Sequence, residues 1–113
     1  MQNPSVEEIQ LDIEDAKSVV SKADALIRLM NNTDFKKIIR EGYFREEAIR
    51  LVELKASPQM RGPEQQQSIL LAIDAIGQLQ QHFNQICVMA EHASAAIDSS
   101  QDELEEMALE GEV

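Results

Sequence analysis

One stretch of the chain limits its possible folds more than any other: residues 63–98 carry apolar side chains at alternating spacings of three and four. We call these positions the C-terminal seam; they are Ile69, Ala72, Ile76, Leu79, Phe83, Ile86, Ala90, Ala93 and Ile97. This heptad spacing is typical of a helix that packs along another helix. The pattern predicts a helix from about Pro63, a residue suited to a first helical turn, to about residue 98. Such a helix spans roughly 50 Å and needs a partner.

A second heptad pattern lies near the N-terminus. This N-terminal seam consists of Val6, Ile9, Ile13, Ala16, Val20, Ala23, Ile27 and Met30. Ser5 followed by Glu8 forms a capping box before it, and neither Gly nor Pro interrupts it before Asn31. We therefore expect a helix over about 5–31, packed antiparallel to the helix over 63–98.

Two shorter helices are expected between the long ones, over 34–41 and 43–56. Asn32 begins a cluster of N-cap residue types, Gly42 has the character of a left-handed C-cap, and Ser57-Pro58 ends the second helix. Helical spacing predicts core placement for Phe35, Ile38 and Ile39 of the first helix. In the second helix Phe44, Ala48, Leu51 and Val52 share one face with Lys55. These helices would cover one end or flank of the hairpin.

Composition supports an all-α protein. The 113 residues include only four Gly and three Pro, and 4% are aromatic, which is too few turn residues for a many-stranded β fold. We expect one helical domain over 1–98, followed by an acidic C-terminal tail over 99–113 that is a short helix or disordered. Two seams of this length are difficult to bury within one small chain, which predicts a dimer or a ring.

Charge is unevenly distributed along the chain. The formal net charge is −11, yet residues 35–61 contain seven basic and four acidic residues, whereas residues 62–113 contain ten acidic residues and no Lys or Arg. The excess of acid disfavours direct binding to nucleic acid or to an anionic membrane, and it favours a protein partner. The basic middle and the acidic C-terminal part either pair within one molecule or guide subunits head to tail.

Neither metal nor catalytic chemistry is indicated. His82, Cys87 and His92 do not share one helix face, and a single cysteine cannot form an intramolecular disulfide. We find no Gly-rich phosphate loop and no nucleophile motif, so we expect a non-enzymatic protein without cofactors. The first ten residues do not resemble a signal peptide and no apolar run is long enough to span a bilayer, so we expect a soluble, cytoplasmic protein.

Two groups of residues are candidates for partner binding. Tyr43, Phe44 and Arg45 form an aromatic and basic corner that either anchors a partner or closes the end of the helical hairpin. The second group is acidic and comprises Asp102, Glu103, Glu105 and Glu106.

The stretch from Asp34 to Leu51, centred on Gly42-Tyr43-Phe44 and followed by a Pro-containing loop and Ile76-Gly77-Gln78-Leu79, resembles small helical proteins of tailed bacteriophages. The resemblance covers about residues 26–86. It implies a viral accessory or virion-assembly protein that acts inside an infected bacterium or in the virion. It assigns no functional residue.

The function we expect is that of a non-enzymatic protein–protein interaction module, a phage structural or assembly component that acts through helix–helix packing. Its partners would be further copies of the chain or another phage or host protein. An alternative is an acidic inhibitor that mimics nucleic acid on a host enzyme, using the same acidic group together with Asp98. A third is a small DNA-packaging subunit that contacts DNA through residues 36–61.

Overall fold

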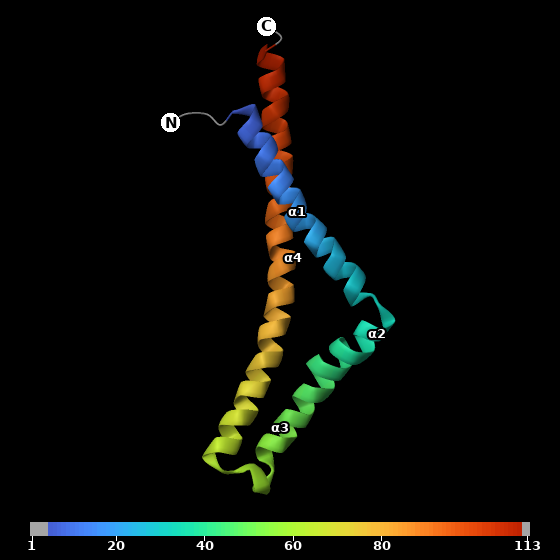
Figure 1. Cartoon of the computed structure of the whole chain (residues 1–113), viewed down its shortest axis with the longest axis vertical. Coiled ribbons are helices and arrows are strands. Elements are labelled where there is room, and N and C mark those ends of the chain that lie inside the picture. Colours follow the sequence, from blue (N-terminus) through green and yellow to red (C-terminus); the bar gives the residue numbers. More distant parts are fainter. Residues whose placement is uncertain (1–4, 112–113) are drawn as a thin grey trace. The chain divides into compact units, whose positions relative to one another are not determined.

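A computed structural model describes residues 5–111, and nearly all of them are helical (Figure 1). The elements are α1 (Val6–Met30), α2 (Thr33–Phe35), the π-helix η1 (Lys36–Glu47), α3 (Ala48–Ala56), the 3-10 turn η2 (Pro58–Met60) and α4 (Pro63–Gly111). No strand occurs among the described residues, and α4 packs against α1 with the shorter helices between them in sequence. The predicted all-α class and helical hairpin are confirmed.

The helix ends follow from local capping chemistry. The Ser5 backbone N–H donates to Glu8 Oε2 at 3.4 Å, and the Glu8 N–H donates to Ser5 Oγ at 3.2 Å, so the predicted capping box forms. The N–H of Phe35 donates to Asn32 Oδ1 at 3.0 Å, which makes Asn32 the N-cap of α2. α4 begins at Pro63 as predicted, because a first-turn residue needs no N–H donor.

The predicted break at Gly42 is wrong. Gly42 lies inside η1, which runs from Lys36 to Glu47 and continues directly into α3, and no glycine of the described residues has a positive φ. A Cβ at Gly42 would lie 3.0 Å from the Lys37 carbonyl oxygen, five residues earlier, as expected where hydrogen bonds join residues i and i+5. The helices predicted over 34–41 and 43–56 are therefore one continuous helical segment.

The π-helix changes which side chains face inward. Its wider turn makes inward positions recur every four or five residues, and the half-buried Phe35, Ile39, Phe44 and Ala48 follow that spacing. Ile38, predicted to lie in the core at ordinary helical spacing, is instead 65% exposed.

The chain divides into two compact units. Over the described residues, unit 1 contains residues 5–25 and 85–111 and unit 2 contains residues 26–84, so the division falls within α1 and α4. In unit 2 the core consists of Leu51, Ile69 and Ile76. The partly buried Tyr43, Phe44, Ala48, Leu54, Met60, Ala72 and Ile73 pack around it. The core therefore joins η1 and α3 to the first part of α4.

In unit 1, α1 packs against α4. Ile9 and Ile13 of α1 are buried, and the C-terminal seam of α4 is half-buried from Ile86 to Ile97. The same spacing continues through the half-buried Ser100, Leu104 and Met107, so α4 does not end near 98 as predicted but reaches Gly111. The acidic stretch is thus part of a 49-residue helix, and residues 112–113 lie outside the described residues.

The last turn of α1 departs from the predicted N-terminal seam. Ile27 is 52% exposed, and the neighbouring Leu26 is buried in its place. Leu26 belongs to unit 2, whereas α1 up to residue 25 belongs to unit 1. The buried side of α1 changes because this last turn has different neighbours; Arg40 of η1, for example, donates to the Met30 carbonyl at 3.4 Å.

Candidate interaction surfaces

The aromatic corner predicted as a partner anchor is mostly part of the core of unit 2. The Phe44 ring packs edge-on against Phe83, with centroids 6.0 Å apart and planes at 64°, and the Tyr43 ring lies 6.0 Å from that of Phe44. Both residues are half-buried and pack against the Leu51 cluster. Of the three predicted residues, only Arg45 is exposed.

The outward side of α3 is apolar and basic. Ile49 is 51% exposed and Val52 is 60% exposed, although Val52 was predicted to face inward with its neighbour Leu51. Arg45, Ile49, Val52 and Ala56 follow one another at spacings of four, three and four, which places them on one helical face. Val52 and Ala56 also line a shallow hollow of about 330 Å³ with Lys55 and Arg61.

We call this set the α3 outer face: Arg45, Ile49, Val52, Lys55, Ala56 and Arg61. It carries three basic side chains, and the exposed Glu53 lies beside them. The structure describes all of unit 2, and within that unit the ion pair is Arg50 with Glu47, outside this face. The basic groups of the α3 outer face therefore have no carboxylate partner in their own unit.

The ion pair of Arg50 and Glu47 supports the junction of η1 and α3. Arg50 Nε lies 3.1 Å and 3.0 Å from the two Glu47 carboxylate oxygens, so the guanidinium binds both. Hydrogen bonding to Arg50 lowers the pKa of Glu47, and the same contact raises the pKa of Arg50. Because both groups are at the surface, the pair contributes little to stability.

The acidic residues predicted to bind a partner are exposed on the last part of α4. Asp102, Glu103, Glu105 and Glu106 all lie on this helix in unit 1. We define the acidic stripe as Asp98, Asp102, Glu105, Glu106 and Leu109, which share one helical face opposite the C-terminal seam. Leu109 is 65% exposed, so this face presents one large apolar side chain among carboxylates.

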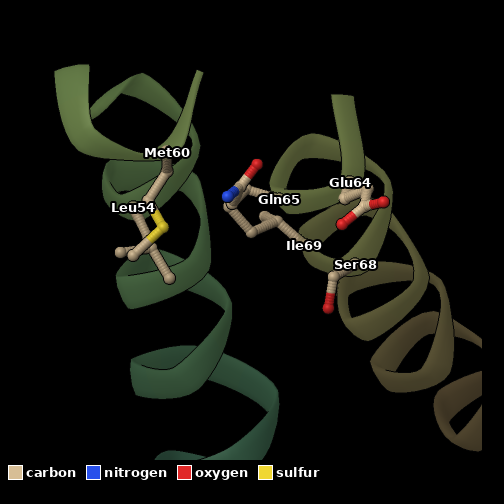
Figure 2. A pocket seen from close by; sticks show the side chains of 6 residues that line it. All are labelled: Leu54, Met60, Glu64, Gln65, Ser68 and Ile69. Atoms are coloured by element: carbon tan, nitrogen blue, oxygen red, sulfur yellow. The ribbon is translucent and has the colours of Figure 1, made fainter. Parts of the chain in front are cut away.

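A second, open hollow lies where the end of α3 and Met60 of η2 face the start of α4 (Figure 2). Its volume is about 320 Å³, and its lining consists of Leu54, Met60, Glu64, Gln65, Ser68 and Ile69. Beside it, the Gln66 side-chain amide donates to the carbonyls of Lys55 at 3.0 Å and Met60 at 2.6 Å. The Lys55 carbonyl is one that α3 leaves unpaired at its C-terminus, so Gln66 fixes the loop to the helix end. Glu64 is the one titratable residue among those that line the hollow.

The residues weighed for metal binding remain apart. His82 lies against Phe83, with ring centroids 6.2 Å apart, and Cys87 is half-buried on the flank of the C-terminal seam. Over residues 5–111, no three His, Cys, Asp or Glu side chains converge as metal ligands. In the same range, no helix combines the length and apolar character needed to cross a membrane.

Comparisons with models of protein families, with curated proteins and with solved structures found no match to this chain. The functional inference therefore depends on the α3 outer face and the acidic stripe themselves. Arg45 and the acidic residues were predicted from sequence, whereas Ile49, Lys55 and Arg61 were not singled out as binding residues. The spacing of Arg45, Ile49, Val52 and Ala56 is the signal that predicts their common face.

Proposed function

We propose that this protein is a non-enzymatic assembly module that associates with further copies of itself through helix–helix packing. Support comes from how little of the chain is buried. Only seven residues qualify as buried core across the described chain, and exposed apolar side chains lie on α1, η1, α3 and α4. A chain with two heptad seams and so small a core gains stability by covering more of its helices.

We place the module among the accessory or virion-assembly components of tailed bacteriophages. The stretch from Asp34 to Leu51 supports this placement, because it resembles such proteins. That stretch forms α2, η1 and the start of α3 in the structure, so the resemblance lies on the elements that build unit 2. Another phage or host protein is a further possible partner for the same surfaces.

The test of self-association is the mass in solution, measured by light scattering after size exclusion over a range of protein concentrations. We expect a multiple of 12.7 kDa at the higher concentrations. A mass of one chain at every concentration, at both low and high salt, would show that the exposed helices do not self-associate. That result would refute the proposal.

The acidic stripe favours a second candidate function, that of an inhibitor that mimics nucleic acid. The carboxylates from Asp98 to Glu110 project from a regular helix, which fixes their spacing and presents a continuous negative surface. This function predicts a monomer that binds a basic, nucleic-acid-binding protein. Replacing Asp102, Glu105 and Glu106 by the neutral amides would abolish that binding, and high salt would abolish it as well.

A further inference from the structure

We propose that the α3 outer face binds the acidic stripe of a second copy, so that subunits join head to tail. This inference rests on the proposed self-association and specifies which two surfaces meet. The two surfaces lie in different units, the α3 outer face in unit 2 and the acidic stripe in unit 1. Each chain thus offers one of each, as a head-to-tail contact requires.

Charge complementarity selects this pairing. The basic side chains of the α3 outer face are Arg45, Lys55 and Arg61, and the exposed Glu46 and Glu53 lie on the same stretch of helix. The region of α4 from residue 98 to residue 111 contains six acidic residues and no Lys or Arg. Opposite potentials on the two surfaces favour their encounter and fix the register in which they meet.

The two surfaces also match in length and in apolar content. The α3 outer face runs along helical positions 45–56 and the acidic stripe along positions 98–109. Each comprises twelve residues, and the eleven steps from first to last correspond to about 16 Å of helix. The exposed side chain of Leu109 can pack against Ile49 and Val52, so the contact buries apolar surface as well as pairing charges.

The association should weaken with salt, because exposed charge pairs are screened at high ionic strength. We therefore expect the dissociation constant measured by analytical ultracentrifugation to rise at least tenfold between low and high salt. An oligomer with the same dissociation constant at both salts would overturn the assignment of these surfaces. The same result would leave self-association intact, so the two proposals fail independently.

Charge reversal locates the contact. Two double variants are needed. The face variant carries Arg45→Glu and Arg61→Glu on the α3 outer face, and the stripe variant carries Asp102→Lys and Glu106→Lys on the acidic stripe. Each should weaken association about ten- to thirtyfold, because attraction is replaced by repulsion at two positions.

The matched control is Lys17→Glu with Lys22→Glu. It makes the same change in net charge as the face variant at two exposed sites on α1. An equal loss in this control would show that only net charge matters, and it would overturn the proposal.

A mixture of the two reversed chains separates contacts between chains from contacts within one chain. In a one-to-one mixture, the acidic face of one variant meets the basic stripe of the other. Association should return to within about threefold of the unaltered chain. If the mixture stays as weak as either variant alone, the surfaces do not meet between copies, and the proposal fails.

A change without charge tests the apolar part of the contact. Val52→Ser removes an exposed apolar side chain and keeps a similar helix propensity, so the fold should persist. Circular dichroism checks that the helix content is unchanged. We expect association at least fivefold weaker than in the unaltered chain, and unchanged association would overturn the placement of Val52 in the contact.

Discussion

The aromatic contacts of Phe83 provide the sharpest test of how unit 2 is held together. Its ring centroid lies 6.1 Å from that of Phe35 and 6.0 Å from that of Phe44, with interplanar angles of 55° and 64°. Tilted and edge-on pairs at these distances contribute about 0.5–1.5 kcal/mol each beyond their apolar burial. Phe83→Leu keeps most of the apolar volume and removes both ring contacts. Because Phe83 is half-buried, we expect unit 2 to lose about 1–2 kcal/mol.

Tyrosine fluorescence during urea unfolding measures this loss. Tyr43 is the single tyrosine of a chain without tryptophan, and it packs against the core of unit 2, so its emission reports on that unit. With a urea dependence of about 1–1.5 kcal/mol per molar, the unfolding midpoint should fall by roughly 1 M.

A double-mutant cycle isolates one ring contact from the general loss of packing. Phe44→Leu, Phe83→Leu and the double variant should give a coupling energy of about 0.5–1.5 kcal/mol. As a control, Phe83→Leu combined with Leu11→Ala on the exposed side of α1 should be additive, because Leu11 lies in unit 1. A coupling energy within about 0.3 kcal/mol of zero for the Phe44 cycle would refute the reasoning, because the two rings would then contribute only through apolar burial.

Three further predictions follow from single residues. Gly77→Ala should stabilise the protein by about 0.5–1 kcal/mol, because nothing lies within 4 Å of a Cβ there. Gly42→Ala should give no such gain, because its Cβ would crowd a backbone carbonyl at 3.0 Å; urea unfolding of the two variants checks the difference. The pKa of Glu47 is lowered by Arg50, so this pair contributes stability above the unfolded-state pKa and loses it as pH falls through the lower folded-state pKa. Lowering the pH from 6 to 3 should therefore lower the melting temperature of the unaltered chain more than that of Glu47→Gln. Equal decreases in melting temperature would contradict the assignment of this ion pair. Gln66→Ala should destabilise unit 2 by about 1–2 kcal/mol, since two backbone carbonyls lose their donor, whereas Gln67→Ala, at an exposed neighbour, should change stability by less than about 0.5 kcal/mol.

Helix starts were predictable from sequence because they depend on neighbouring residues. The Ser5 capping box, the Asn32 N-cap and Pro63 at the start of α4 all involve contacts within one turn. Such chemistry acts without tertiary structure, so the printed sequence contains what is needed to place it. The heptad seam of α4 was predictable for a related reason, because its spacing repeats over many turns.

The π-helix was not predicted because its pattern differs only slightly from that of an α-helix over a short segment. Glycine after a run of helix formers usually ends a helix, and Gly42 fits that expectation on local grounds. The available signal was the spacing from Phe35 through Ile39 and Phe44 to Ala48, which averages more than four residues per turn. The adjacent Ile38 and Ile39 fit an inward face at either α-helical or π-helical spacing. Only the tertiary packing shows that Ile39 is half-buried and Ile38 is exposed.

Parts of the α3 outer face and of the acidic stripe could not be predicted from local sequence either. Leu51 and Val52 are adjacent and equally apolar, yet one is buried and the other exposed, because α3 has a neighbour on one side only within its unit. The acidic stretch was predicted as a separate tail since runs of carboxylates are usually solvated. It remains helical because Leu104 and Met107 extend the C-terminal seam, while the carboxylates occupy the opposite, exposed side.

The same arrangement bears on the kind of assembly that the chain can form. A contact between two different surfaces, one on each copy, leaves an unused surface at both ends of every pair. Further copies must then add until a ring closes or a filament grows, unlike a two-fold dimer, which is complete at two. Since the chain carries a net charge of −11, repulsion opposes each addition, and the basic α3 outer face is where that repulsion is locally reversed. Salt screens both the repulsion and the contact, and because the contact depends on paired charges, its weakening dominates and assembly decreases as the salt concentration rises.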